Sequence, residues 1–262
     1  MSHKREMAGI NGVVSDLDGV TYRGDVPIDS AVRAFKRWNE AGLKYAFVTN
    51  NSTKSPGAFS DKLSRMGIPA KPDQVVTSAQ VAAEKAAVKL PKGASVFVIG
   101  SNALCEEIEK QGFLLTDKSP AGVVVGLDRQ FDFEKLKRAQ AAIFGGAYFI
   151  GTNPDPMLPS ETGFEPGAGA ILKAIETATG VAPNIVGKPR PNMVERALGI
   201  LQTKPENTLM VGDQIKTDIF AGHAAGVKTA LVRSGVVERG PFDVSPDVVI
   251  DTLEELHLTA AP

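Results

Sequence analysis

The sequence predicts an α/β fold in which helices cover both faces of a parallel sheet, and three observations indicate this. Short apolar runs alternate with amphipathic segments of helical length, as in proteins built on a parallel sheet. The first run, over 10–14, carries two adjacent valines, as buried strands do. It ends at two carboxylates, Asp16 and Asp18. Because open parallel sheets bind ligands beyond the carboxyl ends of their strands, we expect both carboxylates at a functional site.

Length and composition restrict the classes of protein that the chain can belong to. It has 262 residues, enough for one large domain or two modest ones, and 43% of them are apolar, so a packed core is expected. The net charge is −1 and the sequence has no long basic run, which argues against a nucleic-acid partner. Its single cysteine, Cys105, excludes an intrachain disulfide framework, and its three scattered histidines form no metal-binding motif.

The sequence gives no indication of a secretory or membrane segment. Residues Met1–Met7 are polar and basic with no apolar stretch behind them, unlike a signal peptide. No run approaches the ~18 consecutive apolar residues of a membrane span. A cytoplasmic protein with no membrane partner is therefore expected, and the low cysteine content fits a reducing compartment.

The expected elements follow from apolar spacing, capping residues and glycine or proline breaks. After the first strand, Asp29-Ser30 starts a helix over 31–41 that Gly42 ends, and a buried strand follows over 45–48. Pro56 opens the next helix, which Gly67 ends. The other expected helices cover 78–90, 103–111, 133–144, 171–179, 193–201 and 219–225, and the other expected strands cover 96–99, 122–126, 148–150, 185–186, 208–211, 227–232 and 248–250.

Asp16 and Asp18 are one residue apart, so their mutual repulsion needs an explanation. A divalent cation such as magnesium, which prefers hard oxygen ligands, would offset it. One carboxylate could also stay ionised while the other holds a proton, which places a nucleophile beside a general acid. The alternative is a solvated turn, because aspartate and glycine are common in turns and calcium loops share the pattern.

A second polar loop, Thr49-Asn50-Asn51-Ser52, follows the next strand and precedes a helix. Hydroxyls, amides and free backbone N–H groups at a helix N-terminus suit a phosphate oxygen. Helix capping by Ser52 or Ser55 is the alternative, although a cap needs only one such residue.

Two further charged motifs lie in the C-terminal part of the chain. Lys188 stands between glycine and proline at the end of a short strand, and lysine is a common phosphate ligand. A solvated surface lysine is the alternative. Asp213 follows the apolar run over 208–211, as Asp16 follows the first run. Asp218 comes five residues later at a helix start, where the helix dipole favours a carboxylate.

The glycine-rich stretch 163–169 does not fit a dinucleotide-binding fingerprint. We expect no strand before Gly167-Ala168-Gly169, the third glycine of the fingerprint is missing, and no acidic residue follows at the right distance. The preceding segment, Gly151–Pro156, is expected to form a long turn.

Together and in this order, these motifs closely resemble those of the haloacid dehalogenase (HAD) superfamily of phosphohydrolases. The matching segments are Asp16–Val20, Val48–Asn51, Gly187–Pro189 and Gly212–Asp218. The insert between the second and third motifs resembles the α/β cap of the NagD-like, or p-nitrophenyl phosphatase, subfamily of subclass IIA. Its signatures are present as Val125–Arg129 and Thr152–Asp155. The resemblance covers nearly the whole chain from Gly9.

This resemblance implies a Rossmann-like core formed by residues 1–78 and 184–262, with a C2-type α/β cap domain inserted at 79–183. It implies a magnesium-dependent phosphatase that hydrolyses small phosphate monoesters, of the nucleotide, sugar or p-nitrophenyl phosphate type, through an aspartyl-phosphate intermediate. It also allows a homodimer formed through the cap.

The resemblance carries roles to individual residues. Asp16 is the expected nucleophile, and Asp18 is the expected general acid and base. Magnesium is expected on Asp16, Asp213 and the main-chain carbonyl of Asp18, with Asp218 orienting Lys188 or a water on the metal. The expected substrate-binding residues are Gly19, Thr49, Asn50, Asn51 and Lys188, of which Thr49 and Lys188 are also expected to be catalytic.

Two cap loops are the expected place of leaving-group recognition. They contain Asp128-Arg129 and Asn153-Pro154-Asp155, and a plain turn is the alternative for the second. Closure of the cap would exclude water during phosphoryl transfer.

One departure from the family pattern lies in the last motif, which often reads Gly-Asp-Arg-Leu-Asp-Thr-Asp. Here Gln214 and Lys216 replace the arginine and the middle aspartate. Asp213 and Asp218 are retained, so we expect catalysis to be intact and only the charge near the metal to differ.

Two other classes of protein would share part of this pattern. A phospho-accepting regulatory domain of receiver type also places an aspartate, a threonine and a lysine at the ends of strands. Asp18 argues against it, because an acid–base residue two positions from the phosphorylated one promotes turnover, whereas a switch needs a long-lived phosphate. A non-catalytic sugar- or nucleotide-binding protein on the same fold would be expected to have lost Asp16 or Asp18, and neither is lost.

Overall fold

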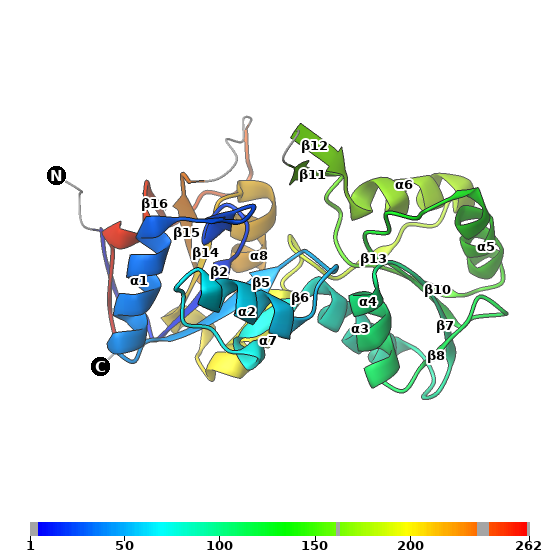
Figure 1. Ribbon diagram of the computed structural model, residues 1–262, viewed down its shortest axis with the longest axis horizontal. Helices are drawn as coiled ribbons and strands as arrows, with labels where there is room; N and C mark the ends of the chain where they lie inside the picture. The colour runs from blue at the N-terminus through cyan, green and yellow to red at the C-terminus, as the bar shows by residue number, and fades with distance from the viewer. Residues whose placement is uncertain (1–4, 161–162, 235–240, 261–262) are drawn as a thin grey trace. The chain divides into compact units, whose positions relative to one another are not determined.

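The computed structural model describes residues 5–160, 163–234 and 241–260, and the chain divides into two compact units (Figure 1). Unit 1 comprises Met1–Thr49, Pro56–Val76 and Lys188–Pro262, and unit 2 comprises Asn50–Ser55 and Thr77–Gly187. The division expected from the sequence differs at three segments. It kept Asn50–Ser55, 77–78 and 184–187 with the core, whereas in the structure all three group with unit 2.

Unit 1 is built on a six-stranded sheet in the order β16-β15-β14-β2-β5-β6 within the described residues. Strand β2 pairs in parallel with β14 and β5, and β15 pairs in parallel with β14 and β16. The strands of this sheet are β2 (Gly12–Asp16), β5 (Lys44–Thr49), β6 (Val75–Thr77), β14 (Thr208–Gly212), β15 (Lys228–Val232) and β16 (Val248–Ile250). The parallel α/β architecture predicted from the sequence is confirmed.

Helices and two small strand pairs complete unit 1. The strand pairs are β1 (Arg5–Ala8) with β17 (Leu256–Thr259) and β3 (Tyr22–Arg23) with β4 (Val26–Pro27). The helices are α1 (Asp29–Glu40), α2 (Pro56–Arg65), α7 (Asn192–Leu201) and α8 (Phe220–Ala224), with short helices η1 (Pro72–Gln74), η2 (Pro205–Asn207), η3 (Ile215–Ile219) and η4 (Leu253–Glu255). None of the helices in the described part of the chain has the length and apolar character needed to cross a bilayer.

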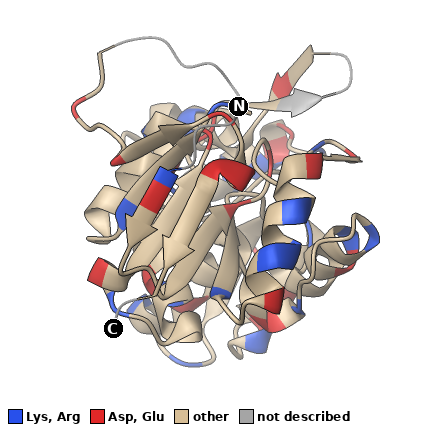
Figure 2. Cartoon of the chain, turned by 90° about the vertical axis from the view of Figure 1, so that its left-hand side faces the viewer, with Lys and Arg blue, Asp and Glu red and all other residues tan. Residues whose placement is uncertain are grey.

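The core of unit 1 explains why its central strands form where they do. All five residues of β2 and all five of β14 are buried, as expected for strands covered on both faces. Helix α1 packs Phe35 against Trp38, Tyr45 and Phe47, with ring centroids 5.0–5.2 Å from that of Phe35. Such aromatic pairs contribute about 0.5–1.5 kcal/mol each beyond the area they bury. On the face of unit 1 shown in Figure 2, positive and negative residues are interspersed.

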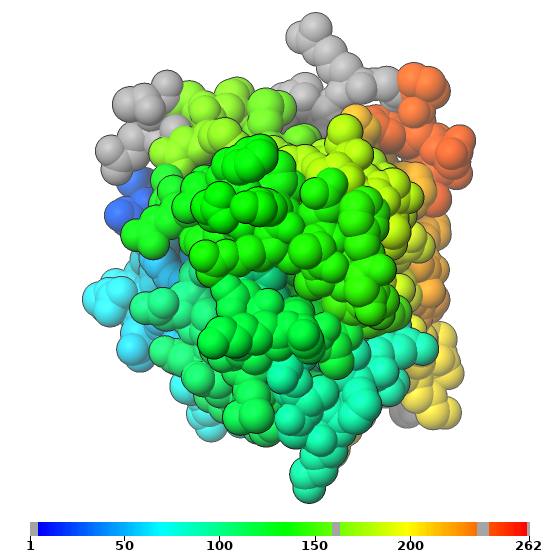
Figure 3. All heavy atoms as spheres, turned by 90° about the vertical axis from the view of Figure 1, so that its right-hand side faces the viewer, coloured from blue at the N-terminus to red at the C-terminus, as the bar shows by residue number. Residues whose placement is uncertain are grey.

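Unit 2 contains a second parallel sheet, in the order β13-β10-β9-β7-β8 within the described residues, and a β-hairpin. Figure 3 shows one face of this unit, coloured teal to yellow-green along the chain. Its strands are β7 (Ser95–Ile99), β8 (Leu114–Leu115), β9 (Gly122–Val125), β10 (Tyr148–Gly151), β11 (Met157–Ser160), β12 (Gly163–Pro166) and β13 (Asn184–Ile185). Its helices are α3 (Ser78–Lys89), α4 (Asn102–Lys110), α5 (Phe133–Phe144) and α6 (Ala168–Thr179).

The structure corrects two local expectations. A strand, β12, does precede Gly167, because Met157–Ser160 and Gly163–Pro166 pair in antiparallel fashion, with Leu158 opposite Glu165. The other two objections to a dinucleotide fingerprint, the missing glycine and the missing acidic residue, still hold. The helix expected over 219–225 begins earlier, since the π-helical turn η3 (Ile215–Ile219) leads into α8.

Candidate active site

The register of the core sheet brings three of the expected site residues to one edge. Asp16 is the last residue of β2 and pairs with Val48, so Thr49 at the end of β5 lies one position beyond it. Asp213 directly follows β14, which is the neighbour of β2 on its other side. Asp16, Thr49 and Asp213 are all buried. Their common position follows from the parallel pairing, because carboxyl ends of parallel strands meet at one edge.

Lys188 joins this group through two short contacts. Its Nζ lies 2.5 Å from Asp16 Oδ1 and 2.6 Å from Asp218 Oδ1, and only 3% of the residue is exposed. The expectation that Lys188 ends a strand of the core sheet is wrong. The nearest strand, β13, stops at Ile185 and pairs with β10 in the sheet of unit 2, whereas Lys188 lies in the turn before α7. A solvated surface lysine is likewise excluded.

Three buried carboxylates converge at this edge of the sheet. Oxygens of Asp16, Asp213 and Asp218 lie within 4.8 Å of one another. Burial raises the pKa of Asp16 well above its ordinary value, the neighbouring charges of Asp218 and Asp213 raise it further, and Lys188 acts in the opposite direction. Burial alone would lower the pKa of Lys188, but the charges of Asp16 and Asp218 outweigh it, so this pKa lies above its ordinary value.

The composition of this group fits a divalent cation. Three buried carboxylates facing one ammonium group leave an excess of negative charge, and oxygen ligands are those that hard cations prefer. A bound cation would also favour the ionised form of Asp16. Among the three, Asp218 is the least available for a metal. Its Oδ1 accepts from Lys188 and its Oδ2 accepts from the N–H of Gln214 at 3.1 Å.

Two of these carboxylates pack against glycines, where a larger residue would collide with them. Gly19 has a φ of +85°, and a Cβ at this position would lie 2.8 Å from Cγ of Asp213. Gly212 likewise leaves room for Asp218, since a Cβ at position 212 would overlap the Asp218 side chain. Only glycine therefore fits at either position without displacing a carboxylate. Gly19, expected to bind substrate, is placed by the structure against Asp213.

Asp18 has different surroundings from Asp16. It is exposed, whereas Asp16 is only 7% exposed, and the turn that follows is held by a hydrogen bond from Gly19 N to Tyr22 O at 2.8 Å. Burial raises the pKa of the Tyr22 phenol above its ordinary value, and the charge of Asp18 raises it further. Tyr22 was not expected at the site. Its place in the turn after the Asp16 and Asp18 motif was the signal that could have indicated it.

The remaining expected substrate-binding residues, Asn50 and Asn51, belong to unit 2. Asn51 Oδ1 accepts from the N–H of Thr53 at 2.9 Å and from its hydroxyl at 2.7 Å, which is an Asx-type turn. Asn50 Nδ2 donates to Asp155 Oδ2 at 2.9 Å. The Asn51 side chain is therefore held by a local turn, and the Asn50 side chain by a residue distant in the sequence.

Ion pairs hold the loop of unit 2 that contains Asp128 and Arg129. Asp128 accepts from Lys135 Nζ at 2.7 Å and from Gln130 N at 2.8 Å. Arg129 pairs with Glu165 of the hairpin at 2.6 Å. Neither partner was expected from the sequence: Lys135 lies seven positions away, in the first turn of α5, and Glu165 lies in the more distant strand β12.

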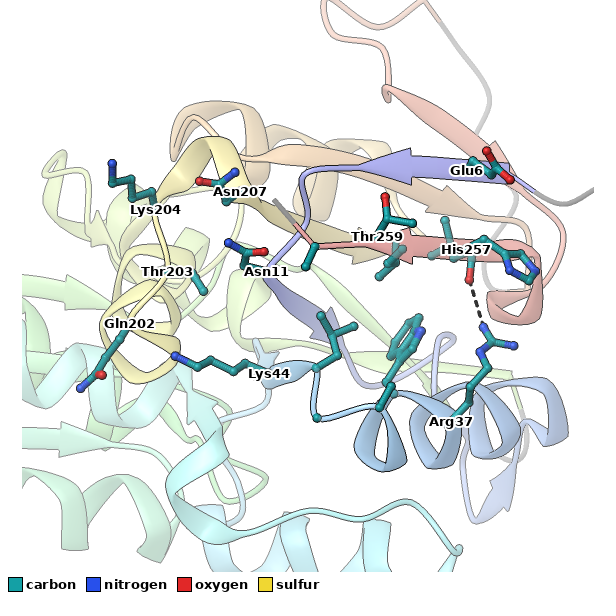
Figure 4. Close-up of a pocket in the computed structure, with 17 residues that line it drawn as sticks. Glu6, Asn11, Arg37, Lys44, Gln202, Thr203, Lys204, Asn207, His257 and Thr259 are labelled. Atoms are coloured by element: carbon teal, nitrogen blue, oxygen red, sulfur yellow. Dashed lines mark hydrogen bonds between the residues drawn. The ribbon is translucent and has the colours of Figure 1, made fainter. Parts of the chain in front are cut away.

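A pocket of about 790 Å³ lies at the opposite, amino-terminal end of the core strands (Figure 4). Arg37, Lys44 and Lys204 contribute positive charge to its lining, and Arg37 Nη2 donates to Leu256 O at 3.0 Å. None of the residues expected at the site lines it. The candidate active site is therefore the carboxylate and lysine group at the carboxyl ends of the strands.

Comparisons with known proteins identify the family to which the chain belongs. The family described as haloacid dehalogenase-like hydrolase matches residues 13–114, and one described as HAD-hydrolase-like matches 185–256. The chain is 39% identical over 254 residues to an acid sugar phosphatase of Staphylococcus saprophyticus, covering 95% of this chain and 98% of that protein. It is 39% identical over 252 residues to the 5'-nucleotidase YutF of Bacillus subtilis, again covering 95% and 98%.

Solved structures give the same result for the fold. A thermostable NPPase double mutant from Geobacillus stearothermophilus superposes with a TM-score of 0.89 at 40% identity, covering 95% of this chain and 98% of that one. A glycerol phosphate phosphatase from Mycobacterium tuberculosis, in complex with calcium, superposes with a TM-score of 0.87 at 33% identity, covering 95% of this chain and 75% of that one. These relatives give no support to the receiver-domain alternative.

Proposed function

Because the chain belongs to the haloacid dehalogenase-like hydrolases and is a phosphatase of their NagD-like, p-nitrophenyl phosphatase branch, we propose that it hydrolyses small phosphate monoesters through phosphorylation of Asp16, with magnesium as the metal. The observation that carries this proposal is the position of Asp16. It ends β2, receives a hydrogen bond from Lys188 at 2.5 Å and is one of three convergent carboxylates. The proposed substrates are sugar, nucleotide and p-nitrophenyl phosphates, the classes named for its relatives.

The first half of the proposed reaction transfers the phosphoryl group to the protein. A carboxylate oxygen of Asp16 attacks phosphorus, and the bond from phosphorus to the ester oxygen breaks. Asp18 donates a proton to the departing alkoxide, which leaves as an alcohol. Its exposed position suits this role, because a group in contact with solvent can regain the proton it has given.

The second half restores the enzyme. Asp18, now ionised, takes a proton from a water molecule whose oxygen attacks phosphorus of the acyl phosphate. The bond from phosphorus to Asp16 breaks, inorganic phosphate leaves, and the Asp16 carboxylate is regenerated. Dividing one slow hydrolysis into two displacements lowers each barrier, and phosphate monoesters are among the slowest substrates to hydrolyse unaided.

Other groups of the chain would bind the phosphoryl oxygens and the metal. Lys188, the Thr49 hydroxyl and the neighbouring Asn50 amide are proposed to bind the oxygens whose charge rises during transfer. Asp16, Asp213 and the main-chain carbonyl of Asp18 would hold magnesium, which when bound supplies positive charge that offsets repulsion between carboxylate and phosphate. Asp218 is proposed to orient Lys188, since its Oδ1 accepts from that ammonium at 2.6 Å.

The test is phosphate release from a panel of sugar, nucleotide and p-nitrophenyl phosphates, with magnesium and with EDTA. We expect release that needs magnesium and is lost in Asp16→Asn. The control is Asp25→Asn, which removes an exposed carboxylate of unit 1 and should keep wild-type activity. Absence of release from every monoester by the wild type, together with a stable phosphoryl group on Asp16 after treatment with acetyl phosphate, would overturn the proposal.

A further inference from the structure

The Asn153-Pro154-Asp155 turn of unit 2 holds Asn50 through both of its polar side chains. Asn153 Nδ2 donates to the main-chain oxygen of Asn50 at 2.8 Å, and Asp155 Oδ2 accepts from Asn50 Nδ2 at 2.9 Å. Asn153 is buried, at 5% exposure, and its Oδ1 accepts from the N–H of Asp155 at 3.2 Å. A plain surface turn would leave these side chains in water, whereas here both are directed to one residue more than a hundred positions earlier.

Further contacts fix Asn50 from other segments of the same unit. The hydroxyl of Ser78, at the start of α3, donates to the Asn50 main-chain oxygen at 2.6 Å. Because a carboxylate only accepts, the NH₂ group of Asn50 faces Asp155, and its Oδ1 must point elsewhere. It points at Gly187, where a Cβ would lie 2.6 Å from it. Gly187 N in turn donates to Thr152 O at 2.8 Å.

Asn50 and Gly187, which lie side by side, are the sequence neighbours of Thr49 and Lys188, two of the proposed phosphate ligands. Asn50 shares a peptide bond with Thr49, and Gly187 shares one with Lys188. We propose that Asn153 and Asp155 are positioning residues for phosphoryl binding. By holding Asn50 beside Gly187, they restrict the two peptides from which Thr49 and Lys188 extend. This inference rests on the proposed function, since it presupposes that Thr49 and Lys188 bind the phosphoryl group.

This role differs from the leaving-group recognition that the family resemblance implied for the turn. A residue that contacts the leaving group changes rates by an amount that depends on which leaving group is present. A residue that positions the phosphoryl ligands affects every monoester alike, because all of them share the phosphoryl group. Phosphoryl transfer depends strongly on positioning, and a misplacement of about 1 Å can lower the rate about 100-fold.

The experiment measures kcat and KM of Asp155→Ala for p-nitrophenyl phosphate, a sugar phosphate and a nucleoside monophosphate. We expect kcat/KM to fall about 10- to 100-fold, by the same factor for all three. The inhibition constant of inorganic phosphate, which has no leaving group, should rise as well. Asp155→Asn should retain most of the activity, because its amide oxygen can still accept from Asn50.

A double-mutant cycle with Asn50→Ala tests the route of the effect. If Asp155 acts through Asn50, then Asp155→Ala causes no further loss once Asn50 is alanine. Losses that multiply in the double variant would overturn the inference. So would a fold-loss that differs more than tenfold between monoesters, or wild-type kinetics in a folded Asp155→Ala protein.

Two further variants keep the test decisive. Asn153→Asp retains the size of the side chain and the acceptor for Asp155 N but removes the donor to Asn50 O, so it should reproduce the loss if Asp155→Ala fails to fold. Asp132→Ala removes the cap of α5, where Asp132 accepts from Lys135 N at 2.8 Å. This control disturbs unit 2 without touching Asn50 and should keep wild-type kcat/KM. A wild type with no phosphatase activity would instead remove the proposed function itself.

Discussion

Lys188 Nζ lies 2.5 Å from Asp16 Oδ1, although 172 positions of the chain separate the two residues. The same ammonium lies 2.6 Å from Asp218, so it bridges two of the three buried carboxylates of the site. Buried charges are stable only when they are paired and hydrogen-bonded. This arrangement links the electrostatics of the site to the stability of unit 1, and several expected outcomes follow from it.

Removing the ammonium group should affect both activity and stability. Lys188→Met leaves Asp16 and Asp218 buried without their shared partner, which is expected to lower the free energy of unfolding by about 3–5 kcal/mol at pH 7. The phosphatase rate should fall about 100- to 1,000-fold, as for other preorganised donors. Chemical denaturation and kcat measure the two effects. Lys173→Met, which breaks an exposed pair with Glu176, should change neither measurably.

The raised pKa of Asp16 gives a stability prediction with a defined sign. The pKa of Asp16 in the folded state lies above its unfolded value of about 3.9. The folded state therefore loses stability as the pH rises from about 3.9 through the folded-state pKa. Asp16→Asn removes this penalty. In EDTA, we expect its melting temperature to exceed that of the wild type at pH 8, with a difference that shrinks toward pH 5.

Magnesium should reverse that order. At about 100 times its Kd, a ligand adds about 2.7 kcal/mol to the stability of the folded state. For a chain of this size we expect a rise of about 5–10 °C in the wild type and little change in Asp16→Asn. An equal rise in both proteins would show that Asp16 is not a metal ligand.

The roles of Asp213 and Asp218 can be separated by titration with magnesium. Asp213→Asn should raise the magnesium concentration for half-maximal activity at least tenfold, since even the loss of a group that supports a metal ligand lowers metal affinity about 10- to 100-fold. Asp218→Asn should lower kcat with a smaller effect on this concentration, because its carboxylate accepts from Lys188 and from Gln214 N. If both variants raise this magnesium concentration equally, Asp218 is a metal ligand too, contrary to our prediction.

Gly19 and Gly24 form a matched pair for a steric prediction. Both have positive φ, +85° and +55°, so alanine strains the backbone at either position. Only at Gly19 would the new Cβ meet Asp213, whereas none of the described atoms lies within 4 Å of a Cβ at Gly24. Gly19→Ala should therefore lower the affinity for magnesium and the phosphatase activity, while Gly24→Ala should lower only the melting temperature. Similar activity losses in both would exclude the steric explanation.

The parts of the fold that could be predicted from the sequence are those with a local signal. The apolar run before Asp16 and the caps of α5 mark their elements because burial and capping act on neighbouring residues. The same reasoning placed Asp16, Thr49 and Asp213 together, since parallel strands end at one edge.

The cytoplasmic location and the homodimer expected from the sequence stay predictions.

Other features depend on tertiary contacts that no local pattern carries. Strand β1 is a short, mostly exposed segment that is a strand only because it pairs with β17 at the other end of the chain. Asn50–Ser55 groups with unit 2 through Asn153, Asp155 and Ser78 rather than through its own sequence. Lys188 follows β13, a strand of the sheet in unit 2 and not of the core sheet. Its ion pairs with Asp16 and Asp218 place it at the site.

The most direct test of the account asks whether Asp16 carries the phosphoryl group during turnover. The reaction with p-nitrophenyl phosphate and magnesium is stopped in acid within the first turnover, and the peptide containing Asp16 is analysed by mass spectrometry. We predict one added phosphoryl group on Asp16 in the wild type. The phosphorylated fraction of the protein should be larger in Asp18→Asn, where hydrolysis of the acyl phosphate is slowed. Phosphate release by Asp16→Asn at the wild-type rate, or turnover of the wild type without any phosphorylated Asp16, would contradict the mechanism.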